Sequence, residues 1–91
     1  MNLEKKFIDL IKNSVNKYLP EAKIFIFGSR ARETNKKFSD IDIAIKNPNK
    51  PDYKLLAMIR FDLEESELPY KIDLSDYHDL DKEILSDAIE I

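Results

Sequence analysis

Three aspartates are the residues of this sequence whose type and spacing suggest chemistry. Asp40 directly precedes the apolar stretch Ile41–Ile45, and Asp42 lies within it, two residues further on. Asp73 is likewise flanked by apolar residues, Ile72 and Leu74. Because successive side chains of a strand point to opposite faces, Asp40 and Asp42 share one face and the isoleucines the other. If the two strands are neighbours, three carboxylates converge. Such a cluster raises the pKa of at least one member unless a cation such as Mg²⁺ compensates.

The same aspartates also fit a structural role without a metal. Asp40 would then cap a turn, while Asp42 and Asp73 would be solvated residues on an exposed sheet face. Aspartate is a poor strand former, so two independent aspartates in the middle of strands are not expected by chance. The carboxylates alone leave both interpretations open.

The only glycine of the chain, Gly28, directly follows an apolar stretch and precedes Ser29. Glycine lets the backbone turn sharply and approach a ligand closely, and N–H groups at the start of the next turn favour anions. Arg30 and Arg32 add positive charge, although a simple turn at a strand end has the same sequence. The further residues of a P-loop or a dinucleotide fingerprint are absent. A phosphate-binding turn followed by three strand carboxylates indicates phosphoryl or nucleotidyl transfer.

The elements that position these residues alternate between helix and strand. Apolar residues at helical spacing predict helices from Leu3 to about Tyr18 and from about Asp52, as N-cap, to Glu67. A final helix is expected from Asp79 or Asp81 onward, with Ile84, Leu85, Ala88 and Ile89 on one face. A helical turn is expected at residues 30–33, and strands at Lys23–Phe27, Asp40–Ile45 and Tyr70–Leu74.

This order predicts an α/β, two-layer domain in which a small sheet of three or slightly more strands carries helices on one face. The strand directions do not follow from the pattern. At 91 residues the chain fits a single domain, residues 1–91.

The composition excludes several classes of function. The net charge of -3 provides no basic excess for binding nucleic acid, so no direct DNA binding is expected. The absence of cysteine excludes disulfides, thiolate nucleophiles and zinc–thiolate sites. No apolar stretch approaches the roughly 20 residues of a membrane span, and no signal sequence is evident, so we expect a cytoplasmic protein.

In its motifs the sequence resembles the minimal nucleotidyltransferase (MNT) family of the DNA polymerase β superfamily. The superfamily pattern is Gly-Ser, a spacer of roughly ten residues, Asp-hydrophobic-Asp-hydrophobic and a later acidic residue. The corresponding residues here are Gly28-Ser29, residues 30–39, Asp40-Ile41-Asp42-Ile43 and Asp73. The resemblance covers essentially the whole chain and implies a polymerase β-like nucleotidyltransferase core.

The resemblance implies a site for two Mg²⁺ ions and a nucleoside triphosphate, commonly ATP. Asp40 and Asp42 would hold the metals, and Asp73 would complete the site for the ion that activates the acceptor hydroxyl. Gly28 and Ser29 would hold the phosphates, with help from Arg32, while Arg30 has no assigned role.

The resemblance also implies a partner. Family members of this size act as antitoxins beside a HEPN ribonuclease toxin and transfer AMP to one of its tyrosines, so a heteromeric complex is expected. Glu33 stands where many relatives have glycine, and a carboxylate close to phosphate would weaken nucleotide binding. The alternative is therefore a weak or inactive domain that neutralises its HEPN partner by binding alone. Transfer to a small molecule or RNA fits the motif but neither the length nor the acidic charge.

Overall fold

The computed structural model describes residues 1–91, and its elements follow the predicted order as far as the third strand. Each predicted helix and strand up to that point is present, with boundaries that differ by three residues or fewer. The elements are α1 (Lys5–Tyr18), β1 (Lys23–Phe27), α2 (Ser29–Arg32), β2 (Ile41–Lys46), α3 (Tyr53–Glu64), β3 (Ile72–Asp76), the 3-10 segments η1 (Tyr77–Asp79) and η2 (Ile84–Asp87), and β4 (Ile89–Glu90).

The strands form one four-stranded mixed sheet in the order β3-β2-β1-β4. β1 runs antiparallel to β2 and to β4, whereas β2 and β3 are parallel neighbours joined through α3. The two strands that carry the aspartates are thus adjacent, as the convergence of the carboxylates requires. Their register places Asp42 directly beside Asp73.

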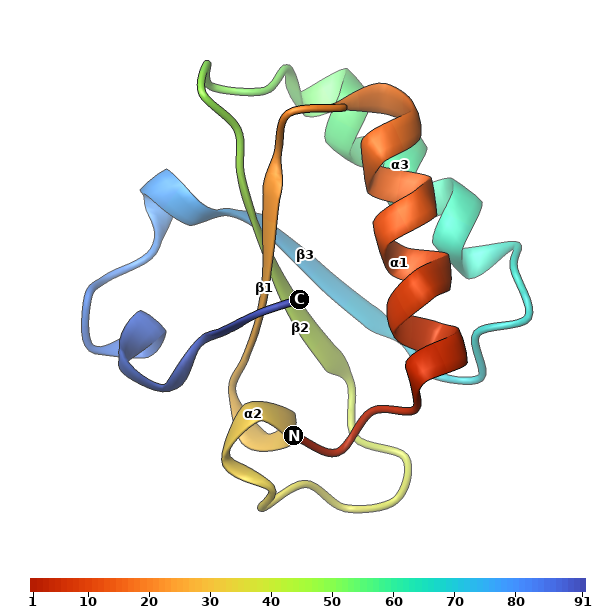
Figure 1. Cartoon of the computed structure of the whole chain (residues 1–91), viewed down its shortest axis with the longest axis vertical. Coiled ribbons are helices and arrows are strands. Elements are labelled where there is room, and N and C mark those ends of the chain that lie inside the picture. Colours follow the sequence, from red (N-terminus) through yellow and green to blue (C-terminus); the bar gives the residue numbers. More distant parts are fainter.

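Helices α1 and α3 lie together on one side of the sheet, and the segment after β3 lies on the other side (Figure 1). The helices bury the apolar face of the strands, so that Ile41, Ile43 and Ile45 have no exposed surface. Asp52 caps α3 as predicted, because its carboxylate accepts a hydrogen bond from the N–H of Lys54 at 3.0 Å. The predicted fold class, a two-layer α/β domain with helices on one face of a mixed sheet, is confirmed.

The predicted C-terminal helix is wrong. The segment forms η1 and η2 and then pairs with the outer edge of β1, where Ile89 lies beside Ile26. Edge pairing satisfies the backbone N–H and C=O groups that a short helix would have satisfied internally. The apolar face predicted for the helix is not buried, since Ile84 and Ile89 remain 46% and 37% exposed. The third strand also begins two residues later than expected, at Ile72. No helix has the length and apolar character needed to cross a membrane.

Candidate active site on the acidic face of the sheet

The polar face of β2 and β3 brings two of the three predicted aspartates side by side. Asp42 and Asp73 are register partners on adjacent parallel strands, and Asp40 lies two residues before Asp42 on the same face. Asp42 is half-buried, and its pKa is raised by burial, by the charge of Asp73 and by the charge of Asp40, in that order. The charge of Arg32 opposes this rise. The register of the two strands therefore holds these like charges within electrostatic reach of one another, which raises the pKa of Asp42.

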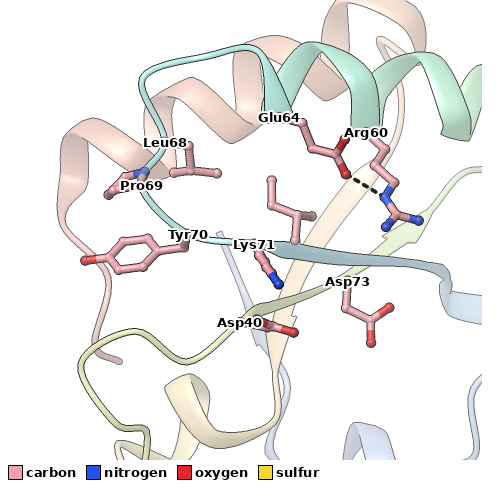
Figure 2. Close-up of a pocket in the computed structure, with 9 residues that line it drawn as sticks. Asp40, Arg60, Glu64, Leu68, Pro69, Tyr70, Lys71 and Asp73 are labelled. Carbon is pink, nitrogen blue, oxygen red and sulfur yellow. Dashed lines mark hydrogen bonds and ion pairs between the residues drawn. The ribbon is translucent and has the colours of Figure 1, made fainter.

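Asp40 and Asp73 are more exposed than Asp42 and open onto a groove of about 620 Å³. In Figure 2, Arg60 and Glu64 reach down from α3 on one side of β3, while Asp40 and Asp73 lie on the other. The nine residues that line this groove are Asp40, Arg60, Glu64, Leu68, Pro69, Tyr70, Lys71, Ile72 and Asp73.

The donor set of this face suits a hard cation, although the chain does not form a closed cage. No three or more His, Asp or Glu side chains lie close enough together to hold a metal ion by themselves. Mg²⁺, however, is usually bound through one or two carboxylates together with waters and substrate phosphates. Asp42 and Asp73 supply such a pair of carboxylates, and Asp40 extends it toward the groove. The residues therefore fit a magnesium–nucleotide complex.

Gly28 occupies a backbone conformation and a space that only glycine tolerates. Its φ of 73° and ψ of -152° fall in a region that side chains exclude. A Cβ atom at this position would overlap Oδ2 of Asp42 and lie 3.2 Å from Cγ. The turn after β1 thus packs directly beneath an aspartate of β2, which joins the two halves of the motif.

Ser29 and Arg32 flank this turn within the single helical turn α2. The chain provides no hydrogen-bond partner for the partly exposed hydroxyl of Ser29, so the hydroxyl is available to a ligand. The side chain of Arg32 is 49% exposed, and its only ion pair is a loose one, 3.9 Å from Asp87. Its charge nevertheless acts on Asp42. Gly28, Ser29, Arg32 and Asp42 consequently lie around one point at the end of β1.

Glu33 terminates α2 in the left-handed conformation, with φ 61° and ψ 29°. Glycine is the residue most often found in this conformation at the end of a helix. The carboxylate of Glu33 accepts a hydrogen bond from the N-terminal ammonium of Met1 at 2.6 Å. That hydrogen bond and the ammonium charge lower the pKa of Glu33. The negative charge is therefore engaged by the N-terminus of the chain.

Arg30 has a structural role that the sequence did not reveal. Its side chain is only 3% exposed, and its guanidinium donates to the carbonyls of Ser39 at 2.7 Å, Asn2 at 3.0 Å and Lys37 at 3.5 Å. The guanidinium also lies 4.1 Å from the ring centroid of Tyr70. Arg30 thus ties together the N-terminus, the loop that ends at Asp40 and the approach to β3. No sequence signal separates it from Arg32.

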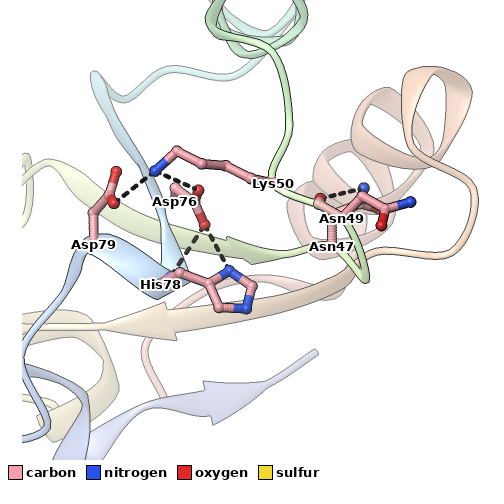
Figure 3. A network of polar contacts seen from close by, with 6 residues as sticks. All are labelled: Asn47, Asn49, Lys50, Asp76, His78 and Asp79. Carbon is pink, nitrogen blue, oxygen red and sulfur yellow. Dashed lines mark hydrogen bonds and ion pairs between the residues drawn. The ribbon is translucent and has the colours of Figure 1, made fainter.

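A second buried charged residue, Asp76, lies at the C-terminal end of β3. Asp76 is 4% exposed and accepts hydrogen bonds from the backbone N–H of His78 at 3.0 Å and its ring Nδ1 at 3.1 Å. Its other oxygen has no hydrogen-bond partner but lies 3.6 Å from Nζ of Lys50, which also contacts Asp79 (Figure 3). Burial raises the pKa of Asp76, but the contacts with His78 and Lys50 outweigh it, so the net pKa is lowered. This network anchors the turn after β2 and places His78 outside the acidic face.

Comparisons with known proteins agree with this geometry. A family model described as polymerase beta, nucleotidyltransferase matches residues 9–90. The probable protein adenylyltransferase MntA of Haemophilus influenzae is 27% identical over 77 residues, which cover 85% of this chain and 68% of that protein.

Two solved structures share the fold. A crystal structure of a toxin–antitoxin with AMP-PNP has a TM-score of 0.67 and 25% identity, covering 87% of this chain and 70% of that chain. A chain in the structure of the tri-AMPylated Shewanella oneidensis HEPN toxin in complex with MNT antitoxin matches with a TM-score of 0.60 and 23% identity. That match covers 90% of this chain and 69% of the other.

Proposed function

Because the chain belongs to the polymerase β nucleotidyltransferase family, whose model spans residues 9–90, we propose that it transfers AMP from ATP to a HEPN toxin and so acts as its antitoxin. The acceptor is a hydroxyl, and we propose a tyrosine hydroxyl. The observation that carries this proposal is the packing of Gly28 beneath Asp42, which itself lies in register with Asp73. This contact joins a phosphate-binding turn to a pair of metal-binding carboxylates.

The turn after β1 binds the triphosphate. Gly28 leaves the backbone bare, Ser29 offers a free hydroxyl, and Arg32 supplies a mobile positive charge near Asp42. Positive charge and backbone N–H groups balance the phosphates and hold the α-phosphorus in place for attack. Glu33, next to this turn, is paired with the N-terminal ammonium of Met1, which offsets part of its negative charge near the phosphates.

Asp40, Asp42 and Asp73 would hold Mg²⁺, which when bound neutralises the phosphates and lowers the pKa of an attacking hydroxyl. Asp42, the most buried of the three, is held by the turn beneath it, whereas Asp73 faces the groove from which an acceptor enters. The acceptor oxygen bonds to the α-phosphorus as the bond to the β-phosphate oxygen breaks. Pyrophosphate leaves, and the hydroxyl proton passes to a carboxylate of the site, for which Asp73 is best placed.

The relatives support the choice of substrate and partner. The Haemophilus protein is described as a protein adenylyltransferase, one solved relative holds AMP-PNP, and another is bound to a HEPN toxin that carries AMP. Neutralisation by binding alone, which Glu33 suggested, is the alternative function; the pairing of Glu33 with the N-terminal ammonium supports the active one.

The test is AMP transfer from α-labelled ATP to the HEPN toxin in the presence of Mg²⁺. We expect label on the toxin with the native chain, and a loss of about 100-fold or more in Asp42→Asn and Asp73→Asn, because each change removes a group that acts on the transferred phosphoryl. Asp81→Asn is the matched control, since Asp81 is exposed and its side chain makes no hydrogen bond or ion pair. Labelling that survives both site substitutions refutes the assignment.

Omission of Mg²⁺ tests the metal separately from the carboxylates. Chelation with EDTA should abolish transfer, and added Mg²⁺ should restore it. Toxin neutralised by the Asp42→Asn chain, without any label, would instead establish the binding-only function.

A further inference from the structure

β3 is an edge strand whose outer backbone groups are free. It ends the strand order and pairs only with β2. The N–H of Ile41 donates to the carbonyl of Lys71 at 2.9 Å, so the backbone groups of Lys71, Asp73 and Ser75 point toward β2. By alternation, the N–H and C=O groups of Ile72 and Leu74 point away from the sheet. An unpaired row of this kind is a template for another extended chain.

A trough runs along this edge between β3 and α3. The groove of about 620 Å³ at the start of β3 opens onto Asp40 and Asp73. A second groove, of about 380 Å³, continues along the end of β3 and is lined partly by Tyr53, Ala57 and Leu74. Arg60 lines both grooves, so the two grooves adjoin each other at its side chain. In Figure 2, Arg60 stands on the helix side of β3 and Asp73 on the opposite side.

We propose that the acceptor segment of the toxin docks as an additional strand on the free edge of β3; the inference rests on the proposed function. Main-chain hydrogen bonds to Ile72 and Leu74 would hold the segment about 4.8 Å from β3. Side chains of the added strand alternate in direction. One set enters the trough beneath α3, and the other points to the face of Asp73.

This geometry accounts for how a hydroxyl reaches the carboxylates. A side chain that projects from the added strand to the acidic face arrives next to Asp73, at the open end of the site. Its two sequence neighbours project the other way, one toward Arg60 and Glu64 and one toward the apolar wall at Ala57 and Leu74. The edge therefore selects an extended hydroxyl-bearing segment with a polar residue on one side and an apolar residue on the other.

Hydrogen exchange in the complex tests the docking mode directly. In the free protein the amides of Ile72 and Leu74 should exchange fast, while those of Asp73 and Ser75 are protected by β2. Addition of toxin should protect Ile72 and Leu74 and leave Asp73 and Ser75 unchanged. Toxin that accepts AMP while Ile72 and Leu74 remain unprotected would overturn the inference and leave the proposed reaction intact. Protection of Leu74 without AMP transfer would refute the reaction and support the docking mode, and absence of both would refute both.

A pair of substitutions on α3 provides a second test. Ala57→Arg places a long charged side chain in the second groove, and Met58→Arg places the same side chain at the next position, which lines neither groove. Both residues are exposed on the helix, so both variants should fold. Ala57→Arg should raise the toxin concentration for half-maximal transfer by about tenfold or more, because it blocks the trough, and should leave ATP binding unchanged. Equal effects of the two substitutions would contradict the docking mode.

Discussion

Arg30 and Arg32 are two residues apart in the same helical turn, and the structure predicts opposite consequences for their removal. Arg30→Ala removes a buried guanidinium whose donors satisfy the carbonyls of Ser39 at 2.7 Å and Asn2 at 3.0 Å. Hydrogen bonds to charged groups contribute about 1.5–3 kcal/mol each, so the two short bonds account for about 3–6 kcal/mol. The contact with Tyr70 adds roughly 1 kcal/mol. Water that reaches the freed carbonyls offsets part of this, and we expect a net loss of about 3–5 kcal/mol.

That loss is large for a chain of 91 residues, whose total free energy of unfolding is about 5–14 kcal/mol. Since 1 kcal/mol corresponds to roughly 4–8 °C for a domain of this size, Tm should fall by at least about 12 °C. Arg30→Lys retains the charge but not the fork of donors, and should lie between Arg30→Ala and the native chain. Urea unfolding followed by circular dichroism measures all three.

Arg32→Ala is the matched control. Its side chain is half exposed and makes one loose ion pair, so its removal should change stability by about 0–1 kcal/mol, as for surface ion pairs generally. It should instead lower AMP transfer, because the positive charge near Asp42 is lost. The reasoning is refuted if Arg30→Lys is as stable as the native chain, or if Arg32→Ala unfolds as easily as Arg30→Ala.

Three further outcomes are expected. Gly28→Ala should lower the free energy of unfolding, measured by urea unfolding, by about 1–3 kcal/mol, the cost of a side chain in this backbone conformation. It should also reduce AMP transfer, measured with labelled ATP, because the added Cβ displaces Asp42. Because the pKa of Asp42 is raised above its ordinary 3.8, the folded chain binds this proton more tightly than the unfolded chain, and stability falls as pH rises from 3.8 through the raised pKa. Calorimetry should therefore find Asp42→Asn more stable than the native chain at about pH 7 and equal to it at about pH 3, and a lower Tm at about pH 7 would contradict the shift. Asp76 has a lowered pKa, so its contribution to stability is complete above 3.8 and is lost as pH falls through the folded value. Asp76→Ala should cost about 1.5–3 kcal/mol near neutral pH, since it removes hydrogen bonds to a buried charge, and the difference from the native chain should shrink in acid.

The strands and helices that alternate regularly were predictable from local pattern. β1 covers the predicted residues Lys23–Phe27, because a continuous β-branched and aromatic run has no competing periodicity. The start of β3 was misplaced because Tyr70 and Lys71 also have strand-like sequence, whereas pairing with β2 determines where the ladder begins. The C-terminal helix was wrong for a related reason. Edge pairing with β1 is a long-range contact that local propensity does not contain.

The candidate site divides in the same way between local and long-range information. The shared face of the aspartates could be predicted because strand alternation is a local pattern. Their proximity depends on the pairing of β2 with β3, which the structure shows. The sequence did not predict that Arg30 is buried whereas Arg32 is exposed. Arg30 is buried because the N-terminus and the loop before β2 fold over it, and these segments have no regular pattern of their own. Site residues that depend on irregular segments are therefore the ones that sequence reasoning misses.

The single glycine illustrates how one residue meets two requirements of the site. Close approach of phosphate to a bare backbone predicts glycine at position 28 but does not require it, since a small side chain such as alanine would leave the N–H groups in place. The structure adds a stricter requirement, because Oδ2 of Asp42 occupies the space of any Cβ atom at this turn. A side chain at position 28 would push Asp42 out of line with Asp73 before it reached a phosphate. Gly28 thus positions the metal-binding carboxylates as well as the triphosphate, and its substitution should weaken both together.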